Sequence, residues 1–352
     1  MKLPFKKESD HVIALDIGSR LVKVVELGRG EHGPRLLRYG TSHVSPDAVV
    51  EGEIMDRDLL LEAIEAAFAN AGIKKGKVVS AVSSRSVIVK RLLMDRMSSE
   101  EARALIEMEA SSHIPFEIED VSLDFQILEP NAGDGKMEVL LVAAKREVIY
   151  EHLSLLRDAG LNPAVIDVDT FAIQNLHEGL RAEEPLATLV NVGSEVTNVS
   201  IVREGFPLFT RDFSVGCGQY VEALQRDLEI PYEEALKLIS TNNVETTHPQ
   251  EAGQETIARL AEEIAVGLER SLAYLRSAGE VEELSGVFLS GGGGNLPVLR
   301  ERLEERLRLP VKAVDPLAAL ELDPAMESEM RELGLPALLG VAVGLGLREV
   351  SA

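Results

Sequence analysis

Two stretches of the chain, ALDIGSRLVKVVEL at residues 14–27 and LVNVGSEVTNVSIV at residues 189–202, align with each other without a gap. Both place the same Gly-Ser pair between two apolar runs, at Gly18, Ser19, Gly193 and Ser194. Each copy is typical of a strand, a tight turn and a second strand. One position sets the copies apart, because Asp16 of the first aligns with Asn191 of the second. We therefore predict a duplicated β-hairpin whose second copy has lost a carboxylate.

The composition indicates an ordinary globular protein. The 352 residues, 45% of them hydrophobic, are enough for about two domains with a sizeable core. The formal net charge of -23, from 59 acidic and 36 basic residues, is unfavourable for contact with nucleic acid or anionic lipid. Neither is therefore expected as a direct partner. A single cysteine, Cys217, excludes an internal disulfide, fits a reducing cytosol, and is expected to be a small packed residue.

The apolar stretches are too short to cross a membrane. The most apolar window, PALLGVAVGLGL at residues 336–347, falls far short of the roughly 20 residues that a span needs. It predicts a buried helix that contains glycine. The N-terminus carries Lys2, Lys6 and Lys7, but no apolar run long enough for a signal peptide follows them. We expect a cytoplasmic protein without direct membrane insertion.

The first half of the chain is predicted to be an α/β unit. Residues 11–44 indicate three strands, residues 56–72 an amphipathic helix, and residues 78–83 a buried strand. After an interruption, residues 163–180 indicate a further strand and a helix that complete this unit.

The interruption, from about residue 86 to residue 160, has the pattern of an inserted unit. Its first helix is predicted to begin at Ser98, where Glu101 follows three residues later as in a capping box, and to end at Pro115. Two alternating strands come next, and a helix that ends at Gly160 closes the unit.

A second α/β half is predicted to begin near residue 187 with the second hairpin. Three helices with a 3.6-residue apolar period occupy residues 217–278, and a strand then leads into a run of glycines. Since no low-complexity linker separates the halves, we expect a ligand cleft between them. The predicted parts are residues 1–85 with 161–183 (first half), 86–160 (insert), 184–213 with 286–352 (second half) and 214–285 (helical subdomain).

The glycine turns are suited to binding phosphate. Glycine lets the backbone approach closely, and serine adds a hydroxyl donor. One Gly-Ser turn is by default only a turn, whereas two facing copies would form a clamp on a polyphosphate. Lys23 either faces solvent or aims its ammonium group at the phosphates. Asp16 is either an ordinary polar residue at a strand end or the carboxylate that holds a hydrated magnesium ion.

A third glycine cluster, LSGGGGNLP at residues 289–297, follows a buried strand and is expected to lead into a helix at Asn295. Backbone without side chains could lie flat beside a nucleoside while the helix N-terminus faces the phosphates. Four consecutive glycines cost conformational entropy, so a plain loop rarely needs them. A flexible hinge is the alternative interpretation.

The order DIGSRLVK, NVGSEVT and SGGGG resembles the phosphate-one, phosphate-two and adenosine motifs of the actin, Hsp70 and sugar-kinase superfamily. This resemblance implies an α/β, actin-like ATPase fold, in which two ribonuclease-H-like halves enclose ATP and Mg²⁺. It also implies that the helix with the sequence YEEALKLI reaches the nucleoside, although an exposed charged face explains that helix equally well. The implied nucleotide-binding residues are Gly18, Ser19, Arg20, Lys23, Gly193, Ser194, Thr197, Asn198, Glu234, Lys237, Gly291, Gly292, Gly293 and Asn295, with Asp16 (through water) and Asn191 at the magnesium ion.

The insert is similar to the extra subdomain of the cell-division protein FtsA. More narrowly, HIPFEIEDVSLDFQIL, together with IALDIGSRLVKVVEL and GTSHVSPDAVVEGEI, resembles the PilM family of type IV pilus assembly proteins. The resemblance to that family implies that this protein is a cytoplasmic, ATP-binding scaffold of pilus biogenesis and twitching motility. It binds the cytoplasmic N-terminal tail of the inner-membrane protein PilN, is thereby recruited to the inner membrane, and could also contact pilus motor components.

Other functions within the superfamily are open at the level of sequence. A catalytic small-molecule kinase would need a carboxylate across the cleft, which Asp167 or Asp169 could supply in place of Asn191. A filament-forming protein like FtsA is a further alternative. Positioning of the reacting groups is most of what catalyses phosphoryl transfer, so the absence of a carboxylate at residue 191 predicts slow or absent ATP hydrolysis. We therefore predict no catalytic residue.

Overall fold

A computed structural model of the protein describes residues 11–45, 48–50, 52–180, 184, 186–240 and 253–350. The prediction that no signal peptide is present rests in part on residues 1–10, which lie outside this set. The ends of the predicted first half, near residue 183, and of the predicted second half, at residues 351–352, lie outside it as well.

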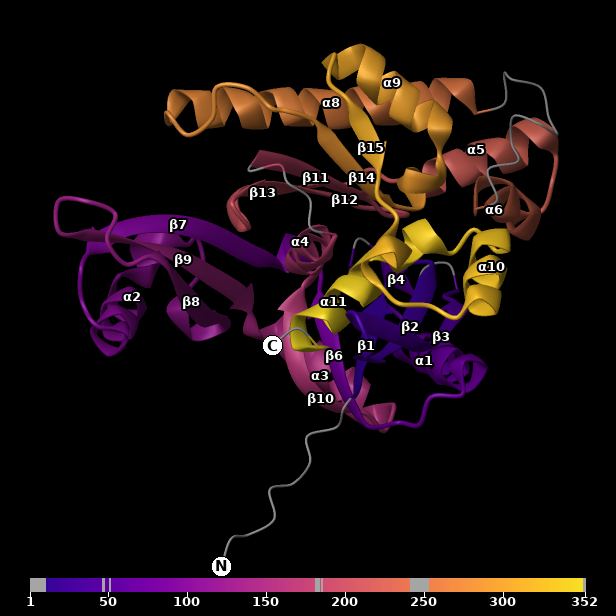
Figure 1. The fold of residues 1–352 in the computed structure, drawn as a ribbon, viewed down its shortest axis with the longest axis horizontal. Helices are drawn as coiled ribbons and strands as arrows, with labels where there is room; N and C mark the ends of the chain where they lie inside the picture. The colour runs from indigo at the N-terminus through magenta and orange to yellow at the C-terminus, as the bar shows by residue number, and fades with distance from the viewer. Residues whose placement is uncertain are drawn as a thin grey trace, which may run out of the picture.

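Two mixed five-stranded sheets with the same strand order form the frame of the molecule (Figure 1). The first sheet has the order β10-β6-β1-β2-β3. Strands β1, β2 and β3 are antiparallel, whereas β6 runs parallel to β1 and β10 runs parallel to β6. The strands are β1 (His11–Ile17), β2 (Leu21–Arg29), β3 (Pro34–His43), β6 (Lys77–Val82) and β10 (Asn162–Val168).

The second sheet repeats this arrangement in the order β13-β12-β11-β14-β15. Three antiparallel strands are again extended by two parallel ones. Strands β11 and β12 therefore occupy the places of β1 and β2, and the duplicated hairpin predicted from the sequence is confirmed. The strands are β11 (Leu186–Val192), β12 (Thr197–Arg203), β13 (Phe206–Phe213), β14 (Val287–Gly291) and β15 (Val311–Ala313).

Two helices, α4 (Asp169–Gly179) and α11 (Gly340–Val350), lie against each other between the sheets (Figure 1). Their side chains share one hydrophobic core with residues from both sheets, including Leu27 of β2 and Leu189 of β11. The apolar window near the C-terminus is thus a buried helix, as predicted. Its position differs from the prediction, because α11 packs against β1, β2 and α4 of the first half rather than within the second.

The contact between α4 and α11 depends on Gly344. A Cβ atom at this position would overlap the carbonyl oxygen of Ala172 in α4. We expect Gly344→Ala to lower the free energy of unfolding by about 1 to 3 kcal/mol, because the two helices would have to move apart in a packed core. Chemical denaturation measures this change. The matched control is Gly76→Ala, where an added Cβ would lie 3.9 Å from the nearest neighbouring atom and the change should be small. Equal effects at the two positions would contradict the close approach.

The first half has further elements on its outer side. Helix α1 (Arg57–Ala71) packs against β2 and β3. The Asp56 side chain accepts hydrogen bonds from two backbone amides at its start, and Gly72 ends it with a φ of 61°. A short hairpin of β4 (Val49–Val50) and β5 (Glu53–Ile54) precedes this helix.

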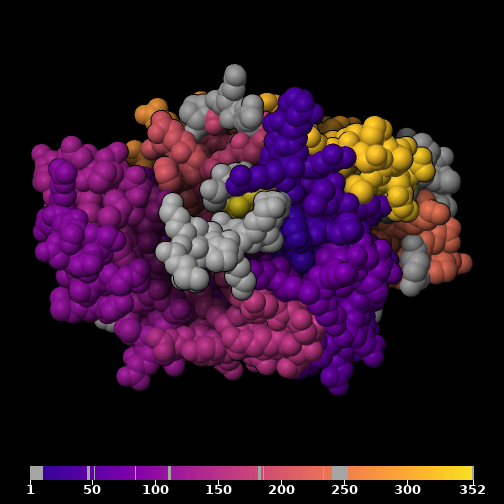
Figure 2. All heavy atoms as spheres, turned by 60° about the horizontal axis from the view of Figure 1, so that its bottom comes forward, coloured from indigo at the N-terminus to yellow at the C-terminus, as the bar shows by residue number. Residues whose placement is uncertain are grey.

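The insert has a separate sheet of order β7-β9-β8 and a hydrophobic core of its own. Figure 2 shows this unit as a lobe at one side of the molecule, coloured purple to magenta. Its predicted capping box is present, since Glu101 accepts from the backbone N–H and the hydroxyl of Ser98. Its elements are η1 (Ser84–Ser86), β7 (Val87–Asp95), α2 (Ser99–His113), η2 (Ile118–Asp120), β8 (Val121–Glu129) and β9 (Lys136–Lys145).

Helix α3 (Arg146–Asp158), which the sequence analysis assigns to the insert, packs elsewhere. Its buried residues Leu155 and Leu156 belong to the core formed by β1, β2 and α1. None of its residues is among the described members of the insert's core. We therefore place the end of the insert at about Lys145 and group α3 with the first half.

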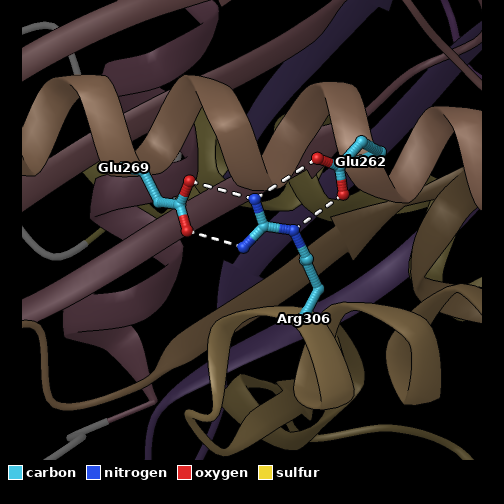
Figure 3. Close-up of polar contacts among 3 residues, drawn as sticks. All are labelled: Glu262, Glu269 and Arg306. Atoms are coloured by element: carbon cyan, nitrogen blue, oxygen red, sulfur yellow. Dashed lines mark hydrogen bonds and ion pairs between the residues drawn. The ribbon is translucent and has the colours of Figure 1, made fainter.

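Helices cover the second sheet. Arg306 of α9 lies between Glu262 and Glu269, two turns apart on α8 (Figure 3). Its guanidinium nitrogens come within 2.7 Å and 2.6 Å of the two carboxylates, which raises the pKa of Arg306 and lowers that of Glu262. This fork joins the two helices at the surface. The helices are α5 (Gly218–Leu228), α6 (Tyr232–Ser240), α8 (Gln254–Ser277) and α9 (Pro297–Leu307).

Short elements connect α9 to the terminal helix. They are η4 (Pro316–Ala319), α10 (Pro324–Glu332) and η5 (Pro336–Leu339). Among the residues described, no single helix is both long and apolar enough to cross a membrane; α10 together with the segment Pro336–Val350 passes that test only as a pair bent by 102°.

Candidate functional site

A cavity of about 660 Å³ lies between the two halves, where the turns of both hairpins meet. Most of the residues predicted to bind nucleotide line it, although they come from distant parts of the sequence. The predicted residues in its wall are Asp16, Gly18, Ser19, Arg20, Lys23, Asn191, Gly193, Ser194, Asn198, Lys237, Gly291, Gly292 and Asn295.

The first hairpin places a cation over its turn. Asp16 and Lys23 are directly opposite each other on β1 and β2, and their side chains form an ion pair of 2.7 Å. Both side chains are 12% exposed, so Lys23 faces the cavity and not the solvent. The Lys23 ammonium lies 3.1 Å from the point that a Cβ of Gly18 would occupy. The absence of a side chain at residue 18 therefore leaves space between the turn and the ammonium.

Arg20 joins the two turns. Its Nη2 atom lies 3.5 Å from a carboxylate oxygen of Glu195, which follows the Gly-Ser pair of the second hairpin. The Nη1 atom of Arg20 is buried and has no hydrogen-bond acceptor among the described residues. A buried guanidinium donor without an acceptor is unfavourable. This wall of the cavity is therefore suited to an anion.

The second hairpin carries neutral groups where the first carries charges. Asn191 and Asn198 are opposite each other, and the Asn191 Nδ2 donates to Asn198 Oδ1 at 3.2 Å. The turn is held by Gly193 N–H, which donates to Val196 O, and by Cys217 N–H, which donates to Gly193 O. Burial raises the pKa of Cys217 to about 11, which agrees with the prediction of a packed thiol.

The glycine run forms a turn of defined conformation. It leaves β14 at Gly291, which has a φ of 75°, and continues as the 3-10 helix η3 (Gly292–Asn295). A Cβ at Gly292 would lie 2.8 Å from the Cys217 sulfur, so this position has no room for a side chain. Asn295 fixes the far end by donating to the carbonyl oxygen of Gly334 at 2.9 Å.

Three predicted residues do not line the cavity. Thr197 is fully buried, and its hydroxyl donates to Val215 O at 2.8 Å, which holds the strand end. Glu234 is exposed on α6 and is not among the residues that line the cavity. Gly293 packs against Val192, where its missing side chain allows η3 to sit close to β11. We therefore withdraw these residues from the nucleotide site.

Apolar residues that the sequence analysis missed complete the end of the cavity near Lys237. They come from α6 and from the segment around η5, and they are Tyr232, Leu236, Ile239, Leu335 and Leu338. The spacing of the first three along the helix is a signal that could have found them, because it places them on one face. Their chemistry suits the flat, apolar surface of a nucleobase.

The two alternative carboxylates have different surroundings. Asp167 is buried and forms an ion pair of 2.6 Å with Arg348, and it does not line the cavity. Asp169 begins α4 and does line it. Only Asp169 is therefore placed to act on a ligand in this cavity.

The cavity continues toward the junction of the first half with the insert. One face of α3 and the β4–β5 hairpin form this part. Its wall combines apolar and charged groups, among them Val49, Ile54, Lys145, Glu147, Val148 and Glu151.

A buried histidine, His152 on α3, lies in the wall between these parts. Its Nε2 atom is 2.9 Å from the hydroxyl of Ser80, which donates to Leu15 O. Burial lowers the pKa of His152 to about 4. The imidazole is therefore neutral at physiological pH.

This histidine should make the fold sensitive to acid. Between pH 6.5 and pH 4 the unfolded chain binds a proton that buried His152 does not, so stability falls as the pH falls through this window. The loss should reach about 3 kcal/mol. In denaturation measured across this range, His152→Gln should remove that part of the pH dependence while keeping a partner for Ser80. The exposed His32→Gln is the control, and an equal change in both variants would contradict the assignment.

The residues present fit a magnesium ion that arrives with a polyphosphate. Among the described residues, no group of three or more His, Cys, Asp or Glu side chains could hold a metal ion alone. Asp16 and Asp169 both face the cavity. Magnesium commonly takes one or two carboxylates and completes its shell with water and phosphate.

Two facing halves of ribonuclease-H type, with glycine turns meeting in the cleft, define the actin-like ATPase fold. Structures of two such proteins share this fold with the chain. The ethanolamine utilization protein EutJ from Carboxydothermus hydrogenoformans matches with a TM-score of 0.52 and 14% identity over 98% of this chain and 91% of that one. MreB5 of Spiroplasma citri bound to ADP matches with a TM-score of 0.51 and 13% identity over 97% of both chains.

The chain belongs to the family of type IV pilus assembly protein PilM, whose sequence profile matches residues 14–350. A solved PilM-PilN type IV pilus biogenesis complex is similar at 28% identity, with a TM-score of 0.81. The match covers 96% of this chain and 98% of that one.

Proposed function

We propose that this protein is an ATP-binding scaffold of type IV pilus assembly that holds the cytoplasmic N-terminal tail of a PilN protein. The observation that carries the proposal is the cavity that reaches from both glycine turns to the junction with the insert. A nucleotide at one end and a peptide at the other would share a wall. Membership of the PilM family supports the pilus role.

The nucleotide part of the proposal rests on the charges of the cavity. Lys23 and Arg20 would bind the phosphates, the turns at Gly18 and Gly193 would admit them closely, and the apolar residues of α6 would hold the base. Asp16 would hold magnesium through water, and the metal would neutralise phosphate charge. MreB5 of Spiroplasma citri, which shares the fold, binds AMPPNP or ADP in solved structures.

The partner part of the proposal rests on the wall formed by α3 and the β4–β5 hairpin. An extended peptide could place apolar side chains against Val49, Ile54 and Val148, while its polar groups meet Lys145 and Glu147. The similar PilM-PilN complex gives the partner its identity. Recruitment to the inner membrane would then occur through the partner, which agrees with a net charge of -23 that disfavours anionic lipid.

Slow turnover of ATP follows from Asn191. An amide cannot accept a proton from water as a carboxylate can, and loss of a general base typically costs about 10²- to 10⁴-fold in rate. A small-molecule kinase would have to use Asp169 as its carboxylate, because Asp169 lines the cavity whereas Asp167 is paired with Arg348 outside it.

Calorimetry with two ligands tests the function. The protein should bind ATP with magnesium, bind a synthetic PilN tail, and release almost no phosphate over hours. A scrambled peptide of the same composition is the control. Binding of ATP without binding of the tail would remove the scaffold role and leave the nucleotide site standing.

A further inference from the structure

A row of four polar side chains crosses the second sheet beneath the proposed phosphate turn. The residues are opposite one another on four neighbouring strands, at Ser290 of β14, Asn191 of β11, Asn198 of β12 and Asp212 of β13. Ser290 Oγ donates to Asn191 Oδ1 at 3.2 Å, Asn191 Nδ2 donates to Asn198 Oδ1 at 3.2 Å, and Asn198 Nδ2 donates to Asp212 Oδ1 at 2.9 Å. We call these residues the amide ladder.

The carboxylate at one end sets the direction of every bond in the ladder. An ionised carboxylate only accepts hydrogen bonds, so Asn198 must turn its NH₂ group toward Asp212. The carbonyl oxygen of Asn198 then faces Asn191, so Asn191 must donate a hydrogen bond from its own NH₂ group. The carbonyl oxygen of Asn191 is left toward Ser290, whose hydroxyl can donate.

This direction has a consequence at residue 191. A carboxylate there would have no N–H group to offer Asn198, so two acceptor oxygens would face each other at about the distance of the present bond. Turning the Asn198 amide would only move the same conflict to Asp212. The ladder therefore tolerates one carboxylate, and it already has one at the β13 end.

We infer that Asp212 is a positioning residue, which fixes the amides of Asn191 and Asn198 at the cavity wall and excludes a carboxylate from residue 191. Asn191 and Asn198 line the cavity, and Asp212 does not. The first hairpin has its negative charge beside the cavity, at Asp16. In the second half the corresponding charge lies two strands farther away, at Asp212. The effect on phosphate rests on the proposed nucleotide site, whereas the coupling of residues 191 and 212 does not.

A charge swap tests the coupling in the absence of nucleotide. Asn191→Asp alone should lower the folding equilibrium constant about 10- to 100-fold, because two acceptors, one buried at Asn198 and one half-buried at residue 191, are left facing each other. Adding Asp212→Asn lets both bonds of Asn198 reverse, while Ser290 still donates to residue 191, so the double variant should recover most of that loss. Asp212 also interacts outside the ladder, so the coupling in the double-mutant cycle is the quantity to measure. Asn191→Asp combined with Asp95→Asn, a highly exposed position, has the same net charge and should show no recovery.

The position of the charge should also change the magnesium dependence of binding. The swapped protein carries its carboxylate beside the phosphates, so its affinity for the non-hydrolysable analogue AMPPNP without magnesium should fall at least about 10-fold and recover with magnesium. Additive effects in the cycle would overturn the ladder. Coupling with an unchanged magnesium dependence would overturn the positioning role. If neither protein binds AMPPNP while the coupling is found, the proposed nucleotide site fails and the ladder stands.

Discussion

Lys23→Met is expected to weaken the binding of ATP about 100-fold or more. The ammonium lies over the first turn with most of its surface buried, and a charge-assisted bond to phosphate in such a place is worth about 1.5 to 3 kcal/mol. Its removal also leaves the carboxylate of Asp16, now without its cation, close to the phosphates. Calorimetry with AMPPNP and magnesium measures the loss.

A paired variant separates this effect from damage to the fold. Breaking a largely buried ion pair by removing one partner is destabilising, so Lys23→Met alone should unfold at lower denaturant concentration. The variant that combines Asp16→Asn with Lys23→Met removes both charges and should regain stability without regaining tight binding. If it bound AMPPNP as well as the original protein, Lys23 would have no role at the phosphates.

Val148→Asp is expected to weaken binding of the PilN tail about 100-fold and to leave the affinity for AMPPNP unchanged. Val148 is half-buried on α3 and faces the part of the cavity near the β4–β5 hairpin. Loss of an apolar contact of this size costs about 1.5 kcal/mol, and a carboxylate in its place adds a desolvation cost. Fluorescence anisotropy with a labelled tail measures the change.

The matched control for this prediction is Val50→Asp. Val50 lies on β4 beside Val49, but its side chain is 38% exposed and does not line the cavity. The same substitution there should leave tail binding within a few-fold of the original. A similar loss in both variants would place the tail on the outer surface of the hairpin, and no loss in either would remove this wall from the partner site.

The repeated Gly-Ser hairpins were enough to predict the duplication, because the same local pattern imposes the same strand pairing in both halves. The fold itself followed from the resemblance of the two hairpins and the glycine run to the motifs of the actin superfamily. The places of Asp16, Lys23 and Asn191 in the cavity wall were predictable for the same reason, since their distance from a turn is fixed. The capping box at Ser98 was equally local. Signals of this kind act within a few residues and can be read directly from the sequence.

Other features depend on contacts between distant segments. Thr197 has a hydroxyl that could bind a ligand, but this hydroxyl donates a hydrogen bond to the backbone carbonyl oxygen of Val215. The sequence at Asp212 gives no sign of the amide ladder, because its partners lie on three other strands. Helix α3 could not be assigned from its own pattern either, since an amphipathic helix does not indicate which of two neighbouring cores will bury it.

The position of α11 affects how the protein can fold during its synthesis. This helix is translated after every other element described above, yet it covers part of β1 and β2, which are translated before all the others. Apolar side chains of the first sheet, such as Leu27, therefore stay uncovered by this helix until residues 340–350 have been made. Although the two halves repeat one strand arrangement, the first half is not complete without α11, and an interrupted chain would expose an apolar surface to chaperones and proteases.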